Sequence, residues 1–174
     1  LAEILACFRI GRGGLLADLF TNRIGRILIA ATKADHLHHD SHDRLQAIVR
    51  RIAERAAGRA RLSGAHVDVV AMAAVRATRE GTVKQGRETL PVIIGTPIAG
   101  ETIGDETFDG DTETAIFPGD LPEDPAEAFE RTGGIRFVRF RPPRLERTAE
   151  GMTLSLPHIR LDRALQFLLG DLLA

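Results

Sequence analysis

The stretch Ile27-Leu28-Ile29-Ala30-Ala31-Thr32-Lys33-Ala34-Asp35 is the most informative part of this chain of 174 residues. Its first half is a short run of branched apolar residues, which is typical of a parallel strand buried on both faces. Its second half therefore falls at the carboxyl edge of an α/β sheet, where such folds bind ligands. A carboxylate there, Asp35, can accept hydrogen bonds from both N1–H and N2–H₂ of guanine, whereas adenine presents an acceptor at N1. Leaving buried polar groups unpaired costs about 1–3 kcal/mol, so this pattern favours guanine.

The residues that follow predict a helix and a second strand. Residues 42–62 repeat apolar side chains at the i, i+3, i+4, i+7 spacing of one helix face, at Leu45, Ile48, Val49, Ile52 and Ala56. Ser41 or Asp40 is expected at the N-cap, and Gly64 is expected to end the helix. Residues 67–75 read as a second buried strand. A strand, helix and strand of this length form a right-handed crossover, which brings Ala74, Val75 and Arg76 to the same edge as Asp35.

Thr-Lys-x-Asp is also the guanine-selecting motif of P-loop GTPases, in a variant with Thr at the position where Asn is commoner. Over nearly its whole length the chain resembles the YcjX-like family of P-loop nucleotide hydrolases, which is linked to envelope stress. The resemblance is carried by residues 4–9, 31–39, 41–45, 67–71, 74–78, 95–98, 117–122, 137–143 and 157–162. It implies guanine-nucleotide binding and GTP hydrolysis. It places base recognition at Thr32, Lys33 and Asp35, and less directly at Ala74, Val75 and Arg76.

In P-loop GTPases a backbone N–H of the second loop points at guanine O6, which favours a small residue there. For Arg76 and Arg79 two interpretations have equal weight, a guanidinium that contacts the guanine or ribose and a surface charge at a helix start. The Lys33 stem is expected to lie flat against the base.

The chain contains neither G-x-x-x-x-G-K-[ST] nor D-x-x-G, so no phosphate loop and no catalytic residue can be named. Together with a first residue that is Leu, this predicts the C-terminal portion of a longer GTPase-like protein. Mg²⁺ is then expected only with the upstream half, and this chain alone should bind GTP or GDP weakly or not at all. The alternative is a stress-response adaptor, in which a protein partner is bound and the nucleotide site is regulatory or vestigial.

The predicted fold class is α/β, the C-terminal half of a P-loop NTPase-like parallel sheet with an added β-rich segment and a terminal helix. We expect residues 1–88 to complete the GTPase-like domain and residues 89–174 to form an extension that packs on it. Residues 1–8 read as the end of a helix, 9–25 as a connection with a short helical piece, 77–88 as a polar stretch, and 89–98 as one or two strands broken by prolines. Residues 101–117 predict a hairpin with Asp109-Gly110 as a type I′ turn, 135–141 a strand, and 159–173 a helix. The apolar stripe of that helix is Leu161, Leu165, Leu168 and Leu172.

Three polar clusters need an interpretation. His36, His38, His39 and His42 lie among acids, but contiguous histidines do not easily face one ion, so a polar loop beside the base is favoured over a metal site. Residues 101–130 carry many acids and no lysine or arginine, which favours a solvated acidic hairpin or partner surface over a Ca²⁺ loop. The arginines of residues 42–62 mostly lie off the apolar stripe and read as a solvated helix face. They are Arg44, Arg50, Arg51, Arg55, Arg59 and Arg61.

Composition narrows the class of protein. A net charge of −1 and the absence of Trp and Tyr argue against nucleic-acid binding. A single cysteine excludes an internal disulfide and favours a cytoplasmic protein. No apolar stretch reaches the length of a membrane span, which leaves only peripheral membrane association open.

Overall fold

The structure is a computed structural model that describes residues 24–129, 138–144, 147–148, 151–152 and 156–173. Within these ranges it is an α/β protein with a small parallel sheet, antiparallel sheets and two α-helices. The expected helix end at residues 1–8 and nearly all of the connection at 9–25 lie outside the described residues. No helix among the described residues combines the length and the apolar content that crossing a membrane requires.

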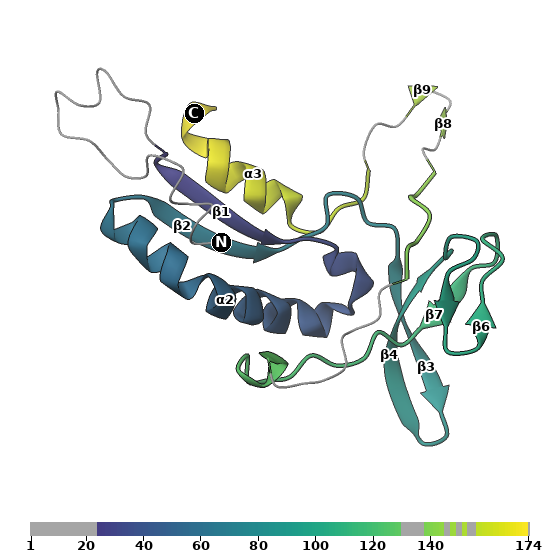
Figure 1. Ribbon diagram of the computed structural model, residues 1–174. Coiled ribbons are helices and arrows are strands. Elements are labelled where there is room, and N and C mark those ends of the chain that lie inside the picture. The colour runs from purple at the N-terminus through teal and green to yellow at the C-terminus, as the bar shows by residue number, and fades with distance from the viewer. Residues whose placement is uncertain (1–23, 130–137, 145–146, 149–150, 153–155, 174) are drawn as a thin grey trace.

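The first half of the chain forms a strand–helix–strand unit, as predicted. Strand β1 (Arg26–Ala31) pairs in parallel with β2 (His66–Ala71), and Ile27 lies opposite Val67. Helix α2 (His42–Leu62) connects them, and α3 (Leu161–Leu169) lies on the other side of the pair (Figure 1). Because both faces of β2 are covered, Val69, Val70 and Ala71 are buried.

Helix α2 has the predicted bounds, and its C-terminus shows why. Gly64 adopts a φ of 87°, its N–H donates to the carbonyl of Arg61, and the N–H of Ala65 donates to the carbonyl of Ala60. This is a Schellman motif, which favours glycine at the left-handed position. Ser41 is the N-cap, as expected, although its side chain makes no capping hydrogen bond.

The buried face of α2 differs in one respect from the predicted stripe. Ile48 and Ala56 are buried as expected, but Ile52 is 56% exposed. The place of Ile52 is taken by alanines at the same helical spacing, Ala53, Ala56, Ala57 and Ala60. The buried face of α2 therefore consists mainly of small side chains, whereas the predicted stripe consisted mainly of larger ones.

The second half of the chain is built from short antiparallel strands. Strands β3 (Arg79–Gln85), β4 (Glu88–Gly95) and β7 (Thr114–Ile116) form one sheet in the order β3-β4-β7. Two-residue strands form small hairpins, β5 (Thr102–Ile103) with β6 (Glu106–Thr107), and β8 (Arg147–Thr148) with β9 (Gly151–Met152). Single-turn 3-10 helices are η1 (Ala34–His36), η2 (His39–Ser41), η3 (Glu127–Phe129) and η4 (Gly170–Leu172).

Several predictions for this half were wrong in detail. The polar stretch 77–88 contains β3. Of residues 89–98, the first seven belong to one strand, β4, which continues through Pro91 opposite Thr82 and ends at Gly95, before Pro97. The tight hairpin turns at Gly104-Asp105. A type I′ turn needs positive φ at both central residues, and only Gly110 of the predicted pair has it. Asp109 instead accepts the N–H groups of Asp111 and Thr112 through its carboxylate, which is an Asx turn.

Two predicted elements near the C-terminus are shorter than expected. Of residues 135–141, only 138–141 are described, and they form a single bridge between Phe140 and Pro97 rather than a strand. The terminal helix α3 covers Leu161–Leu169, and its buried contact is Ala164, whereas Leu165, Leu168 and Leu172 are exposed. The proposed domain boundary at residue 88 lies beside the β3–β4 turn and stays a prediction.

Candidate functional site

The two loops that follow β1 and β2 start side by side at the carboxyl edge of the parallel pair. The N–H of Met72 donates to the carbonyl of Ala31 over 2.9 Å, and the N–H of Ala34 donates to the carbonyl of Met72 over 3.1 Å. Thr32 and Lys33, between these anchors, are exposed at the tip, and Lys33 has a left-handed backbone with a φ of 62°. The edge predicted from the sequence is therefore present, and both candidate loops lie on it.

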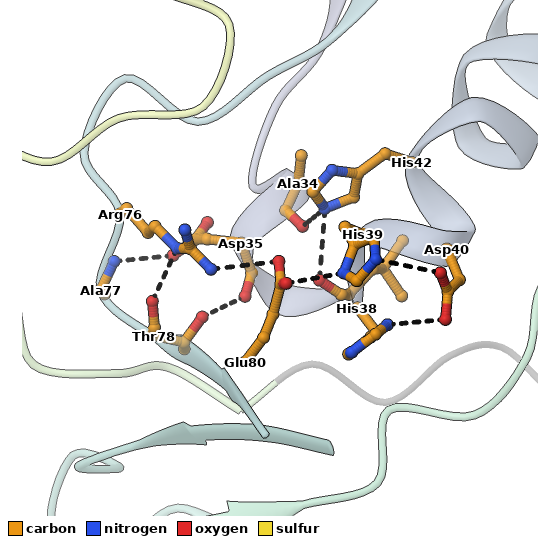
Figure 2. Close-up of polar contacts among 11 residues, drawn as sticks. Ala34, Asp35, His38, His39, Asp40, His42, Arg76, Ala77, Thr78 and Glu80 are labelled. Atoms are coloured by element: carbon orange, nitrogen blue, oxygen red, sulfur yellow. Dashed lines mark hydrogen bonds and ion pairs between the residues drawn. The ribbon is translucent and has the colours of Figure 1, made fainter. Parts of the chain in front are cut away.

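Asp35 lies below this tip and is turned toward the start of β3. Its side chain is buried, with 4% of the residue exposed, and its Oδ2 accepts the N–H of Ala77 over 2.9 Å. The hydroxyl of Thr78 donates to the backbone carbonyl of Asp35 (Figure 2). Among the described residues, Oδ1 of Asp35 has no hydrogen-bond partner. The carboxylate is thus oriented by the segment just before β3 and does not point into bulk solvent.

The loop after β2 is held by the segment that precedes α3. Ala73 exchanges two backbone hydrogen bonds with Ile159, and the N–H of Arg76 donates to the carbonyl of Pro157 over 2.7 Å. Ala74 and Val75 between these anchors are exposed, and within the described residues their N–H groups have no hydrogen-bond partner. The loop therefore presents two adjacent free donors beside Thr32 and Lys33.

Arg76 is engaged by β3 rather than standing at a helix start. Its Nε donates to the carbonyl of Thr78 over 3.0 Å, and its guanidinium pairs with Glu80 at 3.1 Å. The interpretation as a surface charge at a helix start was wrong, because a strand follows Arg76. Ala77, Thr78 and Glu80 were missed by sequence reasoning, since two of the three contacts use backbone groups that leave no signal in side-chain chemistry.

The four histidines have different environments. Nε2 of His42 lies 2.8 Å from the carbonyl of Ala34, so this buried residue ties α2 to η1. His36 is buried, and its ring packs edge-on against Phe140 with centroids 5.3 Å apart. Burial lowers the pKa of His36, while the nearby Asp35 opposes that shift.

His38 and His39, by contrast, converge on one carboxylate. Nδ1 of His38 lies 3.0 Å from one oxygen of Asp40, and Nε2 of His39 lies 3.1 Å from the other. Nδ1 of His39 lies 2.7 Å from an oxygen of Glu80 (Figure 2). Two of the four histidines therefore converge, while His36 and His42 face other partners.

The other two polar clusters belong to other segments, residues 101–130 and helix α2. In the acidic segment, Glu101, Asp111 and Glu113 pair with arginines from neighbouring strands and loops, at Arg139, Arg141 and Arg79 respectively. The Asx turn lowers the pKa of Asp109 to about 2, through hydrogen bonds from Thr112 and Asp111. On α2, the arginines other than Arg44 are exposed, as predicted. A groove of about 370 Å³ is lined by three of them, Arg50, Arg51 and Arg61, together with Pro125 and other residues of α2.

Comparison with known proteins identifies the relatives of this chain. Residues 1–173 match the YcjX-like family, DUF463. The Ras-like GTPase YcjX of Escherichia coli (strain K12) is 33% identical over 172 residues, which cover 98% of this chain and 34% of that protein. The protein of the same name from Shewanella oneidensis is 31% identical over 98% of this chain and 33% of its own length. The chain spans about a third of the length of these relatives. The resemblance read from the sequence is confirmed, and this chain belongs to the YcjX-like family.

Proposed function

We propose that this chain supplies the base-recognition part of a guanine-nucleotide site in a longer protein that hydrolyses GTP. The family and the relatives named Ras-like GTPases support the class of protein. The parallel pair β1–β2 with a helix on each side is compatible with the C-terminal half of a P-loop NTPase-like sheet. The assignment of individual residues rests on the geometry of the two loops.

The observation that carries the proposal is the pattern of free hydrogen-bonding groups at the edge. Ala74 and Val75 offer exposed N–H donors, and Asp35 offers carboxylate acceptors from the neighbouring loop. Guanine carries an acceptor at O6 beside donors at N1 and N2, so it complements donors on one side and acceptors on the other. Adenine reverses the two positions at this edge and would leave these groups unpaired.

The hydrogen bond from Ala77 N–H does not prevent this role for Asp35. Each carboxylate oxygen has two lone pairs, so Oδ2 can accept from Ala77 and from a ligand at once. The bond fixes the carboxylate before the ligand arrives, which reduces the ordering cost of binding. Thr32 and Lys33 are exposed above it, so the apolar stem of Lys33 is free to cover the base.

In P-loop proteins most affinity for nucleoside phosphates comes from the phosphate loop and its Mg²⁺, and this chain contains no such motif. We therefore expect the chain to set base preference, with phosphate binding, Mg²⁺ and the catalytic residues supplied by the rest of the longer protein. Affinity for GTP should accordingly be measured on that longer protein.

The test is Asp35→Asn in the longer protein, with the affinities for GTP, XTP and ATP measured in parallel. The amide donates where the carboxylate accepted, so GTP should bind about ten- to a hundredfold more weakly and XTP more tightly. The amide oxygen can still accept from Ala77, which preserves the loop. Asp105→Asn, in the exposed β5–β6 hairpin, is the control and should change none of the three affinities. Unchanged GTP, XTP and ATP binding in a folded Asp35→Asn variant would overturn the site.

A further inference from the structure

A second cluster, separate from the residues assigned to the base, joins two histidines and an aspartate at the start of α2. One ligand atom from each of His38, His39 and Asp40 lies within 4.8 Å of the other two. His38 is 9% exposed, whereas His39 and Asp40 are exposed, so the cluster has a buried side and a side open to solvent. The backbone explains the convergence. His38 is extended, and His39 begins the 3-10 turn η2, so consecutive side chains are swung toward the same point.

Hydrogen bonding within the cluster does not account for the contact between His38 and Asp40. Nδ1 of His38 is buried and lies 3.0 Å from Oδ2 of Asp40, yet it has no hydrogen-bond partner among the described residues. The two atoms are close, but the N–H direction of the ring does not reach the oxygen. A buried ring nitrogen without a partner is costly. This geometry is expected when Nδ1 of His38 and Oδ2 of Asp40 both point at a metal ion between them and not at each other.

The orientation of His39 gives the second observation. Its Nδ1 lies 2.7 Å from Oε2 of Glu80, and the other oxygen of Glu80 is held by Arg76. If the proton on Nδ1 is shared with Glu80, Nε2 carries a lone pair 3.1 Å from an oxygen of Asp40. Two acceptors at that distance repel, so the arrangement calls for a positive charge between them, either a proton on Nε2 or a metal ion. A carboxylate that fixes the ring of a histidine from its far side is the usual outer partner of a metal-bound histidine.

We propose that His38, His39 and Asp40 bind a divalent transition-metal ion of the Zn²⁺ type, with Glu80 as the residue that orients His39. Two imidazoles and one carboxylate suit Zn²⁺ and its neighbours in the series better than Mg²⁺ or Ca²⁺. Ligands at about 2.1 Å from a tetrahedral ion are about 3.4 Å apart, so contacts of this length need only a small adjustment. Water is expected at the fourth position, on the exposed side. The site goes beyond the proposed base recognition and does not depend on it.

The experiment uses the full chain, tag-free and freed of metal by a chelator that is then removed. Co²⁺ is titrated in and followed by visible absorption, and Zn²⁺ binding is followed by calorimetry. We expect one ion per chain and a visible band typical of four-coordinate Co²⁺. His39→Ala and Asp40→Asn should each weaken binding at least tenfold, because each removes a ligand. Glu80→Gln should weaken it by about ten- to a hundredfold through loss of the outer carboxylate.

His66→Ala is the matched control, since His66 is an exposed histidine at the other end of the α/β unit. It should leave both the Co²⁺ band and the Zn²⁺ affinity unchanged. Three results would overturn the proposal. These are no saturable binding of either ion, an affinity that neither His39→Ala nor Asp40→Asn lowers, or an equal loss of affinity in His66→Ala. In any of these cases the three side chains would be linked by polar contacts alone.

Discussion

The α/β unit of β1, α2, β2 and α3 differs from the antiparallel region of β3 to β7 in how its structure is determined. In the α/β unit, long periodic segments pack through a helix face of alanines and a buried strand. In the antiparallel region, strands are joined by turns without a covering helix among the described residues, and one small cluster of Ile93, Phe108, Val138 and Phe140 forms the core. The two regions meet at Asp35, which contacts the residues just before β3, and at His39, which contacts Glu80 of β3.

This difference assigns separate tasks to the two regions. The α/β unit supplies the candidate binding residues, and the antiparallel region holds them in place through Ala77, Thr78 and Glu80. The ring of His36 in η1 also packs on Phe140. The geometry of the site should therefore respond to substitutions in a region that contributes no residue to base recognition.

The largest expected effect is that of Phe140→Ala. Phe140 is buried in the antiparallel core, and its truncation should lower the free energy of unfolding by about 3–5 kcal/mol, measured by urea denaturation. Because Phe140 also packs on His36, we expect the α/β unit to be destabilised in the same transition. Phe117→Ala, at a residue 45% exposed, is the control, with an expected loss below about 1 kcal/mol. Equal losses in the two variants would mean that the cluster around Phe140 is not a core.

A smaller effect is expected at the joint itself, from Thr78→Val. The substitution keeps the shape of the buried side chain but removes the hydroxyl that donates to the carbonyl of Asp35. The unpaired carbonyl should cost about 1–3 kcal/mol of unfolding free energy. Thr89→Val, at an exposed position on β4, should cost much less. If the two variants were equally stable, β3 would not be holding the Asp35 loop.

The smallest effect is expected from the titration of His36. Burial lowers the pKa of this imidazole below its ordinary value of 6.5, so the unfolded chain binds the proton more readily than the folded chain does. The contribution of His36 to stability is therefore complete above about pH 6.5 and decreases as the pH falls below it. His36→Gln should flatten the dependence of unfolding free energy on pH between 7.5 and 5.5. The carboxylates Glu101 and Glu113, whose pKa values are lowered by arginines, titrate below that window. An unchanged slope in His36→Gln would show that other groups dominate.

Features that depend on interactions between residues close in the sequence could be predicted, and features that depend on contacts between distant residues could not. Helix α2 was predicted at its observed bounds because its periodicity and the glycine after it are local signals. Strand β2 ends at Ala71, before the predicted limit, because the chain then bends to pair with Ile159, a contact over a long sequence separation. The shared edge of the two candidate loops was predicted from the handedness of the crossover. The hydrogen bond from Ala77 to Asp35 could not be predicted, because every residue except proline has a backbone N–H and nothing in the sequence marks this one.

The same reasoning applies to the convergence of His38 and His39. Side-chain directions along a regular strand or helix are fixed by its period, and neither period brings two consecutive rings to one carboxylate. His38 and His39 lie where an extended residue meets a 3-10 turn, and the sequence alone did not indicate that junction.

The left-handed backbone of Lys33 has a consequence for laboratory evolution of this protein. A residue with a β-carbon in that conformation lowers the free energy of unfolding by about 1–2 kcal/mol relative to glycine. A library selected for heat resistance alone should therefore enrich Lys33→Gly, at an exposed position where no packing is lost. If the lysine stem covers a base, the same clones should lose ligand affinity, so that selection for stability and selection for binding diverge at a single codon.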